Sequence, residues 1–343
     1  MPKCTVSIFR LSVLIGLLYA SMLSAFAQKF PLEISTNSST LPPRLTDKIG
    51  FFTPAETPNN ARIIGISAYG AASYTATMIA MNKLWYSQYD RTSFHFFNDN
   101  AGWLQMDKIG HTWTAYSEAF YAKELYEWAG VDSRKAAWIG GGMSWFFQGS
   151  IELLDGYSSG WGASVGDLVA NTAGSALMLG QELAWEEQRM RVKFSFSPPD
   201  YSNYDLPVQQ RASYLYGDTY TNQILKDYNG QIFWLSVNPA SFLSAESRFP
   251  KWLNVAVGYS GEDMFGAEVN QWTANDATAT YQDYSEIERY RQYLLSLDID
   301  LSRIKTRSHL VNMFLQAFNT LKIPAPALEL NTNGKMKVHG LYF

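Results

Sequence analysis

Three consecutive helix-like segments, residues 107–130, 134–156 and 164–189, limit most strongly what this chain can fold into. Each is rich in apolar and small residues and keeps its acidic, imidazole or amide groups at one end. Short turns join them, which indicates that successive helices run antiparallel. Together with an uncharged segment at residues 63–82, they predict a mainly α fold. We expect an up-down bundle of four apolar helices over residues 61–191 and a smaller α+β region over residues 192–343.

The first 27 residues have the features of a secretory signal peptide. Lys3 and Arg10 form a basic region around the start of an apolar stretch at residues 11–20, and residues 25–27 are the small-x-small sequence Ala-Phe-Ala. An uncleaved anchor helix is the alternative, but the apolar stretch is short for one. We therefore expect export to the periplasm or to a membrane of the cell envelope, with outer-membrane association left open. Residues 28–60 are rich in Ser, Thr, Asn and Pro and predict an extended segment.

Cysteine content and charge exclude several classes of protein. Cys4 is the only cysteine and lies in the predicted signal peptide, so the mature chain has no disulfide and no cysteine metal ligand. Loss of Lys3 and Arg10 changes the formal net charge from -4 to -6, that is, -4 minus 2. An acidic exported protein has no electrostatic reason to bind nucleic acid, so no nucleic-acid partner is expected.

The uncharged segment at residues 63–82 is 20 residues long, which would span a bilayer. Its many Ser, Thr, Tyr and Gly residues make it only modestly apolar, so membrane insertion and a buried helix of a soluble protein both stay open. Membrane or envelope components are the expected partners, and the sequence does not indicate an oligomeric state.

After about residue 191 the helical period gives way to short alternating runs, which predict strands. Asn333-Gly334 predicts a tight hairpin between the last two runs, and residues 309–321 predict an amphipathic helix. A terminal Phe343 after a strand is also typical of outer-membrane barrels. Lys337 and His339, however, lie where such a strand would need apolar residues, so we favour an α+β region. The predicted strands are residues 231–238, 251–259, 290–302, 327–332 and 335–343.

One end of the predicted bundle gathers six polar side chains. The ends near residues 107, 155 and 164 should adjoin, because the connecting turn is too short to cross a bundle of about 30 Å. Spacings of three or four residues put pairs of these side chains on the same helix face. The candidate site residues are Asp107, His111, Glu152, Asp155, Asp167 and Asn171.

Structural explanations compete with a functional one for some of these residues. Asp107 could complement its helix dipole, and Asp167 could complete a capping box that begins at Ser164. Glu152 and Asp155 instead lie at a helix C-terminus, where the dipole disfavours carboxylates, so they need a compensating partner or a bound cation.

Convergent carboxylates beside one imidazole suit either an oxygen-rich metal site or acid/base chemistry. His111, Glu152, Asp155 and Asp167 are the candidate ligands of a divalent metal, although their spacing matches no established metal motif. The first interpretation is an envelope protein whose polar cluster binds a ligand or organises the fold. The alternative is a metal-assisted or acid/base hydrolase or transferase acting on lipid or cell-wall precursors. In it His111 would be the base, the carboxylates at residues 152, 155 and 167 would hold a metal or share protons, and Asn171 would orient them.

The same residues resemble the YfiM-like family of predicted periplasmic lipoproteins, which have a domain of unknown function. More loosely, the pattern is similar to VanZ-like membrane proteins. The resemblance implies an envelope location and a helical, membrane-associated core, and it supplies no reaction. The chain departs from a lipoprotein in lacking a cysteine next to the cleavage site, which implies anchoring by the helices or by a partner. The pattern is Asp107-Lys108-x-x-His111, Glu152-x-x-Asp155 and Gly166-Asp167-x-x-Ala170-Asn171-x-x-Gly174.

Overall fold

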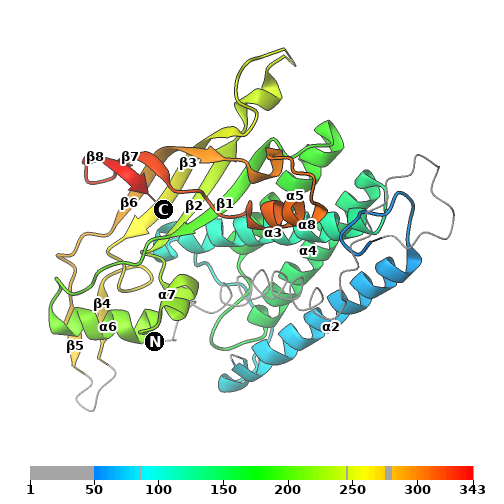
Figure 1. Ribbon diagram of the computed structural model, residues 1–343. Coiled ribbons are helices and arrows are strands. Elements are labelled where there is room, and N and C mark those ends of the chain that lie inside the picture. Colours follow the sequence, from blue (N-terminus) through cyan, green and yellow to red (C-terminus); the bar gives the residue numbers. More distant parts are fainter. Residues whose placement is uncertain (1–49, 85, 245, 275–279, 343) are drawn as a thin grey trace, which may run out of the picture.

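A computed structural model describes residues 50–84, 86–244, 246–274 and 280–342. The predicted signal peptide, Cys4 and most of the predicted extended segment lie outside these ranges. The described part combines long helices with an antiparallel sheet, and Figure 1 shows the helices on one side of the sheet. It is a mixed α+β structure rather than a mainly α one.

Three helices pack closely and correspond to the predicted segments: α3 (Met106–Trp128), α4 (Ser133–Gly156) and α5 (Val165–Trp185). Asp132 caps α4 by accepting from the backbone N–H of Lys135, and Ser164 caps α5 by accepting from that of Asp167. Small residues let the backbones approach. A Cβ added at Gly140 of α4 would lie 2.3 Å from the carbonyl oxygen of Ala119.

The first apolar helix, α2 (Asn60–Leu84), does not join the other three as a full bundle member. It runs along α4, where the Tyr74 hydroxyl donates to Ser150 at 3.1 Å and the Tyr74 ring lies 5.5 Å from that of Phe146. Over Asn60–Lys83 it is long and apolar enough to cross a membrane, and only 6% of its 18-residue apolar window is buried. The predicted four-helix up-down bundle is therefore not confirmed. The helix lacks a stripe of large apolar residues that would hold it against α3.

Six strands form one antiparallel sheet in the order β1-β2-β3-β6-β7-β8. Asn333-Gly334 makes the predicted hairpin, with Gly334 at φ 75°. The strands are β1 (Met190–Phe196), β2 (Gln231–Val237), β3 (Leu253–Glu262), β6 (Tyr290–Ile299), β7 (Ala325–Asn331) and β8 (Met336–Tyr342).

Smaller elements complete the described part of the C-terminal half. The predicted amphipathic helix is α8 (His309–Phe318), whereas the other elements were not predicted: α6 (Leu206–Tyr216), α7 (Tyr220–Lys226) and a separate ribbon of β4 (Gln271–Thr273) and β5 (Tyr281–Asp283).

The two faces of the sheet differ in chemistry. One face carries apolar side chains, and α3 covers only its β1 and β2 portion, where Trp113 lies 5.2 Å from Phe194 and 6.1 Å from Phe233. The other face carries buried polar side chains, among them Lys193, whose Nζ lies 2.7 Å from Asp298 Oδ2, beside a small apolar cluster around Trp234. The sheet therefore buries the face that carries most of its polar groups.

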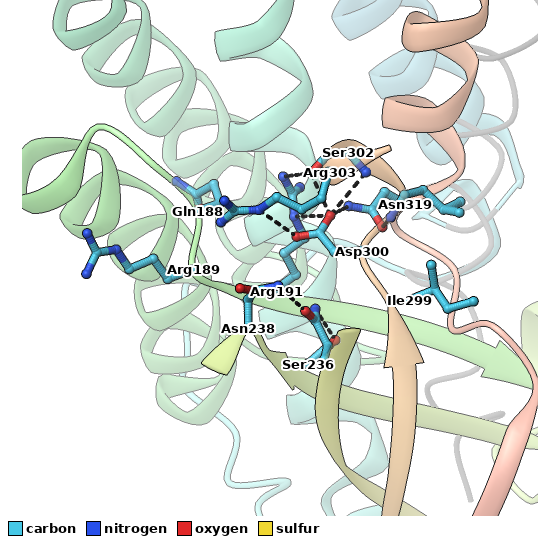
Figure 2. A network of polar contacts seen from close by, with 12 residues as sticks. Gln188, Arg189, Arg191, Ser236, Asn238, Ile299, Asp300, Ser302, Arg303 and Asn319 are labelled. Atoms are coloured by element: carbon cyan, nitrogen blue, oxygen red, sulfur yellow. Dashed lines mark hydrogen bonds and ion pairs between the residues drawn. The ribbon is translucent and has the colours of Figure 1, made fainter. Parts of the chain in front are cut away.

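A further polar network joins the start of the sheet to the segment around α8. Figure 2 shows the Asp300 carboxylate between Arg191 and Arg303, at 3.8 and 3.5 Å, while Asn319 donates to it at 2.7 Å. Arg191 stands at the start of β1, directly after the helical region, so helices and sheet share buried charges as well as an apolar core.

Candidate functional site

Four helix ends meet at one place in the molecule. Asp107 lies in the first turn of α3 and Asp167 in the first turn of α5, while Glu152 and Asp155 lie in the last turns of α4. Tyr86, just beyond α2, reaches the same place. The N-termini of α3 and α5 carry positive partial charge, which stabilises carboxylates there.

His111 is the centre of the cluster and is 5% exposed. Its Nδ1 lies 3.0 Å from the Oδ1 of Asn171, an atom that can only accept, so Nδ1 carries the hydrogen. Its Nε2 then faces two carboxylates, at 3.9 Å from Asp107 Oδ1 and 3.7 Å from Asp167 Oδ1. Among the described residues, that nitrogen has no hydrogen-bond partner. A lone pair facing two anions is unfavourable, so a proton or a cation must lie between them.

Lys108 neutralises part of the charge. Its Nζ lies 2.7 Å from Asp99 Oδ2, 2.7 Å from Asp167 Oδ1 and 3.0 Å from Asp107 Oδ2. Three carboxylates against one ammonium leave a formal charge of -2 around His111 (-3 plus 1). Buried charge of this size needs further compensation, by a proton on the imidazole or by a bound cation.

Glu152 has a specific structural partner that its own helix does not supply. Its Oε2 accepts from the backbone N–H of Ser164 at 3.1 Å, so it stabilises the N-terminus of α5. Its Oε1 is buried and has no hydrogen-bond partner in the described part of the chain, and the carboxyl lies within electrostatic reach of His111. Asp167 therefore does not complete the expected capping box, because Glu152 takes the Ser164 N–H and the Asp167 carboxylate turns to Lys108.

Asp155 is not directed at the imidazole. Its Oδ1 accepts from the Tyr86 hydroxyl at 2.8 Å, on the side of the cluster next to α2. The structure thus brings together Asp107, His111 and Asp167, whose ligand atoms lie within 4.8 Å of one another. Glu152 and Asn171 border this group, and Asp155 stands further out.

The backbone before α3 is strained. Trp103, Leu104 and Gln105 have φ values of 50°, 51° and 66°, a left-handed conformation that non-glycine residues rarely adopt. Contacts with the sheet hold it, because the Tyr259 hydroxyl donates to the Leu104 carbonyl and Arg291 donates to the Gln105 side chain at 2.7 Å. The strained segment fixes where α3 begins, and so the position of Asp107 in its first turn.

Two residues of the cluster could not be found from the helical pattern. Asp99 lies in the connector before α3, and Tyr228, whose hydroxyl donates to Asp107 Oδ1 at 2.9 Å, lies just before β2. Tyr228 is 121 residues from Asp107 in the sequence, so no local spacing predicts the contact.

Comparison with known proteins gives one match. Residues 95–180 match the family described as "Predicted periplasmic lipoprotein (DUF2279)", a range that includes α3, α4 and most of α5 with all six predicted site residues. No curated protein and no solved structure matches the chain. The family match supports the resemblance to periplasmic proteins of unknown function and gives no support to the VanZ-like similarity. It agrees with the predicted location, so the chain is an exported protein of the periplasm or cell envelope. Over its central helices, the chain is thus similar to a periplasmic family of unknown function.

Proposed function

We propose that this envelope protein binds a divalent metal ion between Asp107, His111 and Asp167. The observation that carries the proposal is the orientation of His111. Its Nδ1 hydrogen bonds to Asn171 while its unpartnered Nε2 faces two carboxylate oxygens. In metal sites the ligating histidine is oriented in this way by a partner at its other nitrogen.

Charge and spacing support the same proposal. A net charge of -2 is the charge that a divalent ion with a neutral imidazole would balance. Metal–ligand bonds of about 2.1 Å place neighbouring ligand atoms about 3 to 3.5 Å apart, so separations of 3.7 and 3.9 Å need only a small contraction. Glu152 Oε1, which lacks a hydrogen-bond partner, is a candidate for a fourth ligand. Asp155, one of the four ligands expected from the sequence, is engaged by Tyr86.

The enzyme alternative has less support. A hydrolase or transferase needs a cavity in which the substrate can reach the metal or the base. Two cavities in the described part of the chain, of about 160 Å³ and about 10 Å³, are lined by residues outside the cluster. The side chains of His111 and Asp167 are only 4% and 5% exposed. Burial of this degree supports a bound ion that stabilises the fold more than it supports turnover.

The test is metal content and titration of the purified full-length chain. We expect about one equivalent of a divalent ion by mass spectrometry, and after chelation a calorimetric titration with Zn²⁺ or Mn²⁺ that restores it. His111→Ala and Asp107→Asn should each weaken binding at least tenfold. Asp132→Asn, a helix cap at the opposite end of α4, should leave it unchanged. Absence of a stoichiometric ion in both measurements, or equal affinity in all variants, would contradict the proposal.

A further inference from the structure

Helices α4 and α5 bury polar side chains and expose apolar ones, the reverse of a soluble protein. On α5 the exposed face carries no charge between Val165 and Trp185, and it contains Val165, Val169, Ala173, Ala176, Gly180 and Ala184. The buried face of the same helix contains Asp167, Asn171, Gln181 and Glu182. A surface helix in water normally has the opposite arrangement, with its apolar face toward the core and its polar face toward solvent.

The same inversion occurs on α4. Trp145 is 56% exposed and Phe146 is 60% exposed, in the middle of the helix, and Trp138 and Leu153 extend the apolar face toward its ends. Ser144, Gln148, Glu152 and Asp155 are buried.

Helix α2 extends this apolar surface. It lies along α4 with 24 residues of membrane-spanning composition and almost no burial. At 1.5 Å per residue it is about 36 Å long, compared with a hydrocarbon core of about 30 Å. Exposed lysines mark opposite ends of this surface, Lys83 at the end of α2 and Lys135 at the start of α4, at positions suited to phospholipid phosphates.

The sheet shows the same pattern independently. On β3, Val255 and Val257 are exposed while Asn254 is buried, and Val257 pairs with Leu295 of β6. Both strands have ten residues, the length of a membrane-spanning strand. One row of directly paired residues crosses five strands on the exposed apolar face: Leu235, Val257, Leu295, Leu328 and Val338.

The two residues that argue against a lipid-facing β8 in the sequence do not lie on this face. His339 Nε2 lies 2.8 Å from Glu329 Oε2, and Lys337 Nζ lies 3.7 Å from Glu329 Oε1, on the inner side of the sheet. Val338 between them is 80% exposed. The strand therefore alternates apolar outward with polar inward, as a lipid-facing strand does.

We propose that the hydrocarbon of a lipid bilayer covers both apolar surfaces, so that the described part of the chain is embedded in a membrane with a polar interior. Figure 1 shows α2 on the side of α3 and α4 away from the sheet, so the two surfaces face different directions. A single interface with a second copy could cover one of them. A surrounding lipid phase covers both.

The test uses single-cysteine spin labels in the mature full-length chain, which has no other cysteine. Labels at Val169→Cys on α5 and Val257→Cys on β3 probe the two surfaces, and Asp200→Cys in an exposed loop is the control. The protein is reconstituted in vesicles of phosphatidylethanolamine and phosphatidylglycerol at a ratio of three to one. We expect collisions with oxygen to exceed those with a water-soluble nickel chelate at residues 169 and 257, and the opposite at residue 200.

The proposal is overturned if the folded protein is monomeric in detergent-free buffer with all three labels open to the nickel chelate. It is also overturned if the labels at 169 and 257 are shielded without lipid, with spin–spin coupling that rises with protein concentration, because a second copy then covers them. All three substitutions change exposed side chains, so folding is retained, and circular dichroism checks this. The result is independent of metal binding, which is measured separately.

Discussion

At the scale of single residues, Glu152 holds together two helices. Its Oε2 accepts from the Ser164 N–H, so the carboxylate at the C-terminal end of α4 compensates the positive end of α5. The unfavourable position of Glu152 in its own helix is thus offset by the neighbouring helix.

We predict that Glu152→Ala lowers the free energy of unfolding by about 1 to 2 kcal/mol, the usual cost of losing a helix cap. Glu152→Gln keeps an acceptor oxygen and should lose much less. Denaturant unfolding of the metal-free protein measures both. If Glu152→Gln is as stable as the parent and yet binds metal more weakly, Glu152 is a ligand as well as a cap. An unchanged stability in Glu152→Ala would show that the Ser164 contact contributes nothing.

Asp227 provides a pH-dependent contribution to stability, between α7 and β2. Burial raises the pKa of its carboxyl to about 7, and hydrogen bonds from Tyr201 and Asn229 only partly offset this. Because the pKa in the folded state lies above the unfolded value of about 3.9, the folded protein binds this proton more tightly. The stabilisation is complete below about pH 4 and is lost as the pH rises through 7.

The predicted result is a decline in unfolding free energy between pH 4 and pH 7 that is reduced in Asp227→Asn. Three pKa units correspond to at most about 4 kcal/mol. Urea unfolding across this pH range measures the slope. Glu246→Gln, at an exposed position, is the matched control and should follow the parent. Parallel curves for the parent and Asp227→Asn would exclude this role.

At the scale of elements, glycines set the distance between helices. A Cβ at Gly140 would lie 2.3 Å from the Ala119 carbonyl oxygen, while a Cβ at Gly142, in the same helix, would meet nothing within 4 Å. Substitutions at these two glycines therefore distinguish the effect of helix packing on stability from the effect of helix propensity.

Gly140→Ala should force α3 and α4 apart and destabilise the protein by about 1 to 3 kcal/mol. Gly142→Ala should be neutral or stabilise by up to about 1 kcal/mol, because alanine is the better helix former. Thermal unfolding by circular dichroism compares the two. Equal melting temperatures would mean that α3 and α4 are not in close contact.

The elements also show what a sequence pattern can and cannot predict. Helices α3 to α5 and the hairpin at Gly334 follow from local signals: caps, small residues and a turn dipeptide. Strand β1 was missed because the predicted helical bundle extends to residue 191, while the strand begins at Met190. Its residues pair with residues of β2 that lie 35 (231 minus 196) to 47 (237 minus 190) positions away, and local propensity does not determine such long-range pairing.

In the candidate site too, some features follow from the sequence and others do not. The helix-end positions of Asp107, Glu152 and Asp167 follow from helix lengths and short turns. The role of Glu152 as a cap for α5, and the contact of Tyr228 with Asp107, depend on how the helices rotate and dock.

At the scale of the whole molecule, the helices and the sheet form one unit through buried polar contacts. The Tyr116 hydroxyl donates to Gln188, and Gln181 Oε1 accepts from the backbone N–H of Met190, the first residue of β1. The predicted division near residue 191 therefore falls inside a hydrogen-bond network.

We predict that a chain ending at residue 189 fails to form the native helix packing. It would lose β1 and β2, which pack against Trp113, and the two hydrogen bonds between Gln181 and Met190, each contributing about 1 kcal/mol. Near-ultraviolet circular dichroism and protease resistance, in the same detergent as the full chain, provide the measurement. A fragment as resistant as the full chain would show that the helical region is an independent domain.

The alternation of apolar and polar residues on β3, β6 and β8 also bears on how the chain leaves the cell interior. Because polar residues recur along each of these strands, they contain no long apolar run, and the chain as a whole has a mean hydropathy of -0.17. A translocation channel retains long apolar helical segments in the membrane, and the strands of the C-terminal half do not form such a segment. The C-terminal half can thus pass unfolded through an aqueous compartment, and the apolar face of its sheet forms only when the strands pair.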